Sequence, residues 1–318
     1  MLEIGYLLLV ETIVSVSAII STYTTKRLND VLRCISSVKN QTFPPTEVIL
    51  VLDPSEKLME FFKSRIPLSI RIVMSDDVGL SNARNIGIKN ARGTIVAFID
   101  DDATADEKWL EKMIKNYEDP NVIGVGGLIR AVWKSERPIW FPEELDWIVG
   151  CSYKGFPKGA STIRNPLGCN MSFRKSVFEK VGYFRSDFGR SGRKLLSCEE
   201  TEFSIRALRK IKNSKIVYDH LAVVNHRIDE SRASLKYVLT RSFYEGVSKA
   251  LIAFKSNSST ISSTEEPYLN YLVKSAVPSR LRRIYRFENL SQLIVLFLSA
   301  FTVLTAFLLT RRIHAFEE

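Results

Sequence analysis

The sequence contains little cysteine and little histidine, and these shortages exclude two kinds of protein framework. Its 318 residues include four cysteines and three histidines, and no two cysteines form a CxxC pair. Zinc-binding modules and disulfide-stapled secreted domains need such pairs or a denser set of cysteines. We therefore expect four reduced thiols in a domain that faces the cytosol.

Acidic residues are also in short supply relative to basic ones. The chain has 35 Asp and Glu against 45 Lys and Arg, a net charge of +10. Such a charge suits an anionic ligand, nucleic acid or an anionic membrane surface. The arginines of Arg280–Arg286 lie directly before a long apolar segment. Membrane contact explains this clustering, so we expect a membrane partner and no nucleic acid.

The segment Leu290–Thr310 has no charged residue at all. At ~1.5 Å per residue it is roughly 31 Å long as a helix, enough to cross the hydrocarbon core of a bilayer. The alternative is a buried helix of the core. More arginine precedes the segment than follows it, which predicts a single-pass protein of the cell membrane with a cytoplasmic catalytic domain. The apolar start Ile4–Ile20 lacks a basic cluster and contains Glu11, so it is a poor signal peptide.

Before this segment, apolar strands alternate with amphipathic helices, a pattern typical of a parallel sheet with right-handed crossovers. The carboxyl ends of such strands meet at one edge, where open α/β sheets bind nucleotides. Three polar strand ends, Thr22, Asp53 and Asp100–Asp102, are expected to meet there. The expected strands are Val14–Ser21, Glu47–Leu52, Ser69–Val73 and Ile95–Ile99, and the helices between them are Arg27–Asn40, Ser55–Ser64 and Gly79–Ala91.

The second half of the chain has a less regular pattern. An aromatic insert, Trp133–Arg164, interrupts the alternation and predicts an ordered loop. A polar connector, Lys255–Glu266, and a basic amphipathic segment, Tyr268–Phe287, precede the apolar one. The expected strands are Val122–Val132, Gly168–Phe173, Ile216–Tyr218 and Ala222–Val224, and the expected helices are Ala105–Tyr117, Lys175–Lys180, Cys198–Lys210 and Leu235–Phe254. We expect four parts: 1–254, 255–289, 290–310 and a short tail, 311–318.

Three adjacent carboxylates, Asp100, Asp101 and Asp102, end the buried strand of Thr94–Asp102. Close carboxylates repel one another, and a divalent cation such as Mg²⁺ or Mn²⁺ offsets the repulsion. Asp100 and Asp102 are therefore candidate ligands, and His226 is a candidate third ligand, with a structural role as its alternative. The competing interpretation of the three carboxylates is a solvated acidic turn.

A second acidic group, Glu199-Glu200-x-Glu202, opens a predicted helix. One of its carboxylates is a candidate base for an acceptor hydroxyl. Acidic residues in a first turn also complement the helix dipole, which is the commoner reason for them. The small and polar residues of Gly168–Arg174 are candidates for an acceptor pocket, with an ordinary strand and turn as the alternative.

Together these motifs resemble the inverting GT-A glycosyltransferases of glycosyltransferase family 2. The resemblance implies an α/β fold with a Rossmann-like, mostly parallel sheet. It implies that Glu200 is the base and that Asp102 and Asp100 bind the metal. The residues that carry it are Ala18–Tyr23, Val51–Asp53, Gly79–Gly87, Phe98–Asp102, Gly168–Arg174 and Cys198–Phe203. Those implied to bind the nucleotide sugar, expected to be UDP-linked, are Thr22, Tyr23, Asp53, Arg84, Asp100 and Asp101.

A narrower resemblance is to the archaeal and bacterial branch typified by glucosyl-dolichyl phosphate glucuronosyltransferases. It rests on Trp140–Glu144, Trp147–Cys151, Arg164–Pro166, Arg241–Lys249 and the late apolar segment. It implies transfer of a sugar, with glucuronic acid as one candidate, to a lipid-linked acceptor near Glu199, Asn170, Trp140 and Trp147. The alternatives are cell-surface polysaccharide synthesis with another donor sugar and a scaffold without activity. A nucleotidyltransferase would want a glycine-rich loop after the first strand, and Ser21–Thr25 has no glycine.

Overall fold

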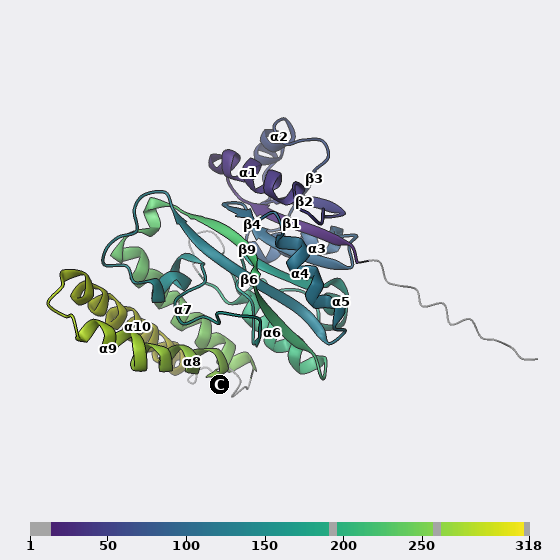
Figure 1. Cartoon of the computed structure of the whole chain (residues 1–318). Coiled ribbons are helices and arrows are strands. Elements are labelled where there is room, and N and C mark those ends of the chain that lie inside the picture. Colours follow the sequence, from purple (N-terminus) through teal and green to yellow (C-terminus); the bar gives the residue numbers. More distant parts are fainter. Residues whose placement is uncertain (1–13, 191–195, 257–261, 315–318) are drawn as a thin grey trace, which may run out of the picture.

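The computed structural model describes residues 14–190, 196–256 and 262–314. A nine-stranded sheet with the order β3-β2-β1-β4-β8-β6-β9-β5 runs through the domain, and β7 pairs with β9. Helices cover both of its faces, and a group of C-terminal helices lies on one side of the domain, at the lower left of Figure 1.

The first part of the sheet is parallel, as the alternation predicts. Strand β1 (Val16–Thr22) lies between β2 (Glu47–Leu52) and β4 (Ile95–Asp100), and β3 (Arg71–Met74) pairs with β2. The crossovers contain α1 (Leu28–Lys39), α2 (Glu56–Lys63) and α3 (Leu80–Asn90). Because these strands share one direction, Thr22, Asp53 and Asp100 lie at or just after neighbouring carboxyl ends.

The remaining strands make the sheet mixed. Strand β8 (Asn170–Arg174) is antiparallel to both β4 and β6 (Val122–Trp133), and β5 (Ala103–Ala105) and β7 (Ser161–Ile163) are antiparallel to β9. Only β6 and β9 (Lys215–Ile228) restore a parallel pairing. The expected mostly parallel arrangement therefore holds for β1 to β4, and this second part departs from it.

Three predicted elements of this part were wrong. The short strands expected at Ile216–Tyr218 and Ala222–Val224 are one strand, β9, with a register shift opposite Gly127 and Leu128. The helix expected from Ala105 begins only at Trp109, because Ala103–Ala105 pairs with β9 as β5. Helices α4 (Trp109–Lys115), α5 (Lys175–Val181) and α6 (Glu199–Lys210) complete the domain. The aromatic insert is ordered and contains a 3-10 helix, Glu143–Val149.

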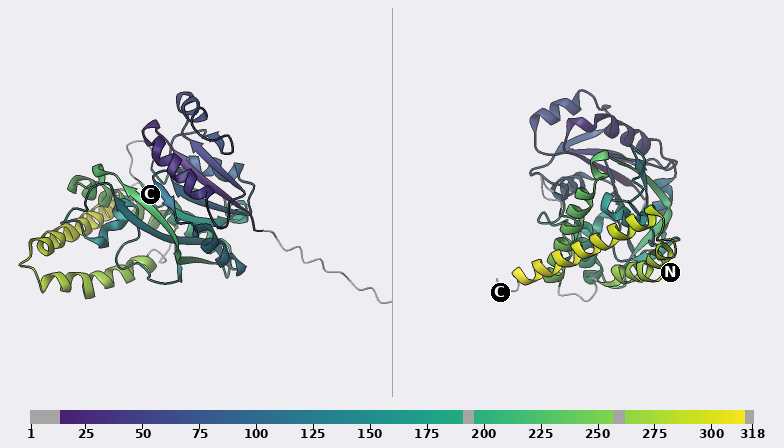
Figure 2. Two further views of the ribbon diagram at one scale, coloured as in Figure 1. Left: turned by 45° about the horizontal axis from the view of Figure 1, so that its top comes forward. Right: turned by 90° about the vertical axis from the view of Figure 1, so that its left-hand side faces the viewer.

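The C-terminal helices form a layer against this domain (Figure 2). The layer consists of α7 (Leu235–Ser256), α8 (Ser262–Tyr271), a π-helical turn (Leu272–Ala276), α9 (Val277–Leu281) and α10 (Phe287–His314). Part of the expected polar connector is thus helical, and its residues 257–261 lie outside the described residues. Helix α10 is long and apolar enough to cross a membrane over Phe287–Ile313, and 28% of its most apolar window is buried against the protein.

Candidate active site

The acidic end of β4 is buried and contacts basic side chains from three separate segments. Asp101 and Asp102 are 3% and 7% exposed. Nη1 of Arg27 lies 2.6 Å from Oδ1 of Asp101 and 3.1 Å from Oδ2 of Asp102. Asp102 also lies 3.0 Å from Nε2 of His226 and 3.4 Å from Nη2 of Arg232. These contacts offset the repulsion between the carboxylates. The acidic end of β4 is therefore a buried cluster of ion pairs, which we call the basic cluster after Arg27, His226 and Arg232, and not a solvated turn.

The two buried carboxyls of this cluster differ in their affinity for a proton. Burial, followed by the charge of Asp102, raises the pKa of Asp101 to about 6, although Arg27 opposes the rise. Burial also acts to raise the pKa of Asp102, but His226, Arg232 and Arg27 together bring it below its usual value. Asp102 is therefore held as a carboxylate, with both oxygens close to cationic or hydrogen-bonding groups.

Three other groups at this edge could hold a metal ion. A carboxylate oxygen of Asp100, the sulfur of Cys169 and a ring nitrogen of His226 all lie within 4.8 Å of one another. The side chain of Asp100 is 33% exposed, so the group is open on one side. Oxygen, nitrogen and sulfur donors suit a divalent transition metal, and Mg²⁺ would be held mainly by the carboxylates. Asp100 and His226 thus fit the expected ion, whereas burial raises the pKa of the Cys169 thiol well above its usual value and makes it a poor ligand for such an ion.

The membership of this group differs from the expected set in one residue. Asp100 and His226 come together as expected, whereas Asp102 contacts His226 from the side of the basic cluster. The proximity of Cys169 to this group could not be predicted because its place depends on strand pairing. Strand β8 is antiparallel to β4 with Ile99 opposite Asn170, which puts Cys169 next to the end of β4.

Arg84 connects this edge to the second acidic group. Its Nη1 lies 2.6 Å from Oε1 of Glu199, and its Nη2 lies 3.4 Å from Oδ1 of Asp100. The same Nη2 donates a hydrogen bond of 2.9 Å to the carbonyl of Gly168. Arg84 is 2% exposed, so it is a buried bridge. The start of α6 and the end of β4 therefore belong to one site.

The backbone at the start of α6 is strained. Cys198, which precedes the helix, has a φ of 73°, a left-handed conformation that costs a residue other than glycine free energy. This bend directs Glu199 toward Arg84 and leaves Glu200 as the next residue of the first turn. Burial, followed by the charge of Glu199, raises the pKa of Glu200 to about 8, with a smaller opposing effect of Arg84.

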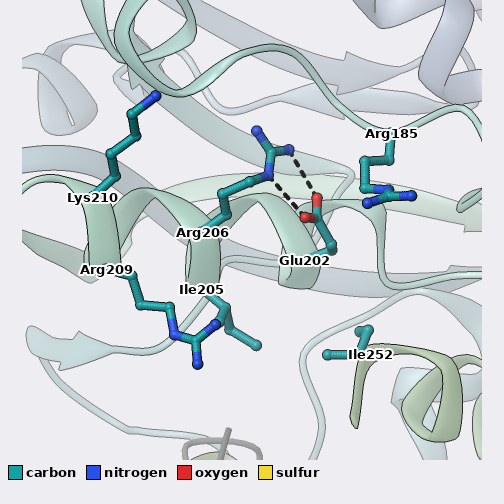
Figure 3. A pocket seen from close by; sticks show the side chains of 7 residues that line it. All are labelled: Arg185, Glu202, Ile205, Arg206, Arg209, Lys210 and Ile252. Atoms are coloured by element: carbon teal, nitrogen blue, oxygen red, sulfur yellow. Dashed lines mark hydrogen bonds and ion pairs between the residues drawn. The ribbon is translucent and has the colours of Figure 1, made fainter. Parts of the chain in front are cut away.

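Glu202, the third acid of the motif, points elsewhere. Its carboxylate forms a bidentate ion pair with Arg206, with both contacts at 2.8 Å. Figure 3 shows this pair beside a hollow of about 290 Å³ that Arg185, Arg209 and Ile252 also line. Glu202 is therefore part of the outer face of α6, and Glu199 and Glu200 are the acids of the site.

The comparison with protein families identifies the family of the chain. Residues 17–182 match the model of "Glycosyl transferase family 2". The chain belongs to glycosyltransferase family 2. A glucosyl-dolichyl phosphate glucuronosyltransferase of Haloferax volcanii is 31% identical over 87% of this chain and 89% of its own. The succinoglycan biosynthesis protein ExoM of Rhizobium meliloti is 26% identical over 71% of each chain.

Solved structures place the glycosyltransferase in the GT-A fold. The crystal structure of GalNAc-T7 with UDP, GalNAc and Mn²⁺ matches it with a TM-score of 0.50 and 16% identity. The match covers 84% of this chain and 57% of that one. At this identity the likeness concerns the fold, which confirms the expected fold class.

The residues expected to bind the nucleotide lie along the carboxyl edge of the glycosyltransferase. Thr22 is buried at the end of β1, whereas the Tyr23 ring is 61% exposed and lies 5.3 Å from the guanidinium carbon of Arg27. Asp53 follows β2 and accepts a 3.5 Å hydrogen bond from the Gly79 amide. Burial raises the pKa of Asp53. Arg84 is occupied by carboxylates, so its expected contact with the nucleotide stays a prediction.

The residues expected near the acceptor lie in different surroundings, and one of them is fully buried. Asn170 is 0% exposed, accepts from the Trp109 indole at 2.7 Å and donates to the Leu128 and Ala222 carbonyls at 2.9 Å. It therefore ties β8 to its neighbours inside the core and is not on an acceptor surface. The indole nitrogen of Trp147 donates a 3.4 Å hydrogen bond to the hydroxyl of Tyr268 in α8. The centroids of the Trp140 and Phe141 rings lie 5.8 Å apart.

Proposed function

We propose that this glycosyltransferase transfers a sugar from a nucleoside diphosphate sugar, expected to be UDP-linked, to a lipid-linked acceptor, with inversion at the anomeric carbon. The observation that carries the proposal is the bridge of Arg84 between Glu199 and Asp100, at 2.6 and 3.4 Å. It joins the start of α6, where the candidate base Glu200 follows Glu199, to a candidate metal site at the edge of the sheet where nucleotides bind.

In this mechanism an acceptor hydroxyl oxygen attacks the anomeric carbon while the bond from that carbon to the diphosphate breaks. Glu200 accepts the hydroxyl proton. Asp100 and His226, with Asp102 beside them, would hold Mg²⁺ or Mn²⁺, which would neutralise the charge of the departing diphosphate when bound. The nucleotide binds at the carboxyl edge of the sheet, which is lined by Thr22, Tyr23, Asp53 and Asp101. One displacement without a covalent intermediate inverts the configuration.

The donor sugar that we propose is glucuronic acid, on a dolichyl or polyprenyl phosphate-linked sugar acceptor. This choice follows the function named for the relative from Haloferax volcanii, which aligns with most of the chain. The relative from Rhizobium meliloti carries the name of a polysaccharide biosynthesis protein. Another donor sugar in cell-surface polysaccharide synthesis is therefore the second candidate.

We further propose that the enzyme works on the cytoplasmic face of the cell membrane and is attached through α10. The length and hydropathy of α10 allow it to cross the bilayer once. They equally allow it to lie flat against the bilayer, because both arrangements bury apolar surface in lipid.

The proposal is tested with membranes that contain the full-length protein. They are incubated with a panel of labelled sugar nucleotides, UDP-glucuronate among them, and with lipid-linked monosaccharide acceptors. We expect label in the lipid fraction from one donor and loss of that label with Glu200→Gln. The matched control is Glu202→Gln, the same change on the outer face of α6, which should keep the activity. Transfer by Glu200→Gln at the normal rate contradicts the assigned base, and no transfer from any donor contradicts the function.

A further inference from the structure

Helix α10 has one face against the protein and an opposite face that is apolar and exposed. On the inner face, the Ser299 and Ser242 hydroxyls lie 2.8 Å apart. A Cβ on Gly246 of α7 would come within 2.3 Å of the Val303 carbonyl, so the two helices touch at the backbone. The outer face repeats every three or four residues and consists of Leu290, Ile294, Phe297, Phe301, Leu304 and Leu308, each 42% to 70% exposed.

Helix α7 contacts both the middle of α10 and the segment that begins α6. On the side of α6, Glu245 of α7 accepts a 2.9 Å hydrogen bond from the Ser197 hydroxyl. Ser248 of α7 accepts a 3.1 Å hydrogen bond from the Ser197 amide. Ser242 and Gly246 of the same helix contact the middle of α10. Glu200 is therefore one helix away from the centre of α10.

This packing is incompatible with a crossing helix. A helix that spans ~30 Å of hydrocarbon has its middle near the midplane of the bilayer. Arg241, Glu245 and Lys249 of α7 would then lie at that same depth, joined by ion pairs of 3.6 Å. Charged groups at the centre of a bilayer are costly, and a catalytic domain with an open site would have to enter the lipid with them.

Both ends of α10 carry exposed arginines. Arg282, Arg283 and Arg286 are exposed before it, and Arg311 and Arg312 are exposed in its last turn. Gln292 fixes the first turns, because it donates to the Ile139 carbonyl at 2.9 Å and accepts from Arg280 at 2.8 Å. Positive charge at both ends suits a helix whose two ends meet the anionic headgroups of one leaflet.

We propose that α10 lies flat in one leaflet of an anionic membrane, with its outer apolar face in the lipid and its inner face on α7. The protein supplies the polar side that an interfacial helix normally carries itself. Figures 1 and 2 show α8, α9 and α10 on one side of the domain, away from α2. Both ends of α10 and the catalytic domain then face the same aqueous compartment. The proposal does not depend on the sugar transferred.

The decisive experiment measures on which side of the membrane the end of α10 lies. All four native cysteines are buried, so an introduced cysteine is the group that an impermeant maleimide labels. Full-length Arg312→Cys and Leu68→Cys are compared in sealed vesicles. Leu68, which is 102% exposed between α2 and β3, reports the side of the catalytic domain. Equal labelling of both before detergent is expected. Labelling of Arg312→Cys only after detergent, where Leu68→Cys labels without it, overturns the proposal.

A second measurement tests the outer face. Leu304→Asp places a charge on the face that we assign to lipid, and Leu68→Asp is the same change on the far side of the domain. Loss of the half-exposed leucine should lower co-flotation with phosphatidylglycerol-containing vesicles roughly tenfold. Leu68→Asp should bind as the unmodified protein does. Equal binding by both variants contradicts the assigned face.

Discussion

The raised pKa of Glu200 gives a quantitative prediction for the pH dependence of transfer. A general base acts only in its ionised form. With a pKa of about 8, roughly a tenth of the Glu200 side chains are ionised at pH 7 and roughly nine tenths at pH 9. The kcat/KM for the donor should therefore rise about tenfold between pH 7 and pH 9 and then level off.

The neighbouring charges predict how this profile moves in variants. Glu199 is the largest influence on the pKa of Glu200 after burial, Glu245 raises it further, and Arg84 lowers it. Glu199→Gln removes a like charge, so the rise in rate should move to lower pH. Glu245→Gln should move it in the same direction by less. Glu202→Gln should leave the profile in place, because the Glu202 carboxylate is paired with Arg206.

The assay measures initial rates of label transfer at low donor concentration and constant ionic strength from pH 6 to pH 10. Donor binding is measured over the same range, so that a change in binding is separated from a change in the base. A rate that is flat or falls between pH 7 and pH 9, with donor binding constant, refutes the assignment. An unchanged profile in Glu199→Gln refutes the electrostatic account of the raised pKa.

Three further predictions concern the supports of the site. Arg280→Met breaks a bidentate ion pair with Glu144, which is 1% exposed. It should lower the free energy of unfolding by about 3–5 kcal/mol in denaturant titrations. Arg283→Met, the same change at an exposed position, should have little effect. His226→Ala should weaken Mn²⁺ binding at least about tenfold by electron paramagnetic resonance, and unchanged affinity would remove His226 from the metal site. Gly246→Ala forces the backbones of α7 and α10 apart and should therefore lower the melting temperature of the protein by several degrees. An unchanged melting temperature would argue against the close packing of the two helices.

The elements that could be predicted from the sequence are those with a strong local pattern. The strand Glu47–Leu52 has the predicted bounds because a continuous β-branched and aliphatic run ends abruptly at Asp53. Strand β9 was divided in two because Asp219 and His220 are polar and lie at the register shift with β6. Only its pairing with β6 reveals one strand, and that pairing joins residues far apart in the chain.

The site shows the same division between local and long-range information. Asp100, Asp102 and Glu200 could be proposed for the candidate site because each belongs to a compact acidic motif. Arg27 and Arg232 could not, because single arginines on a helix or turn resemble solvated ones until the fold brings them to Asp102. The first residues of α8 are polar and were expected to be a connector. Their helix is held by Glu265, which pairs with Arg164 and Lys249 at 2.8 and 2.5 Å.

The ion pairs between the domain and its C-terminal layer have a practical consequence for shortening the chain. A protein cut after residue 254, the boundary that the sequence favours, would lose Glu265 and leave Arg164 and Lys249 without that carboxylate. It would also lose Arg280 and leave the buried Glu144 without its cation. The helices of the C-terminal layer therefore contribute ion pairs on which the domain depends. A soluble version is better sought by replacing the outer residues of α10 with polar ones than by deleting the helix.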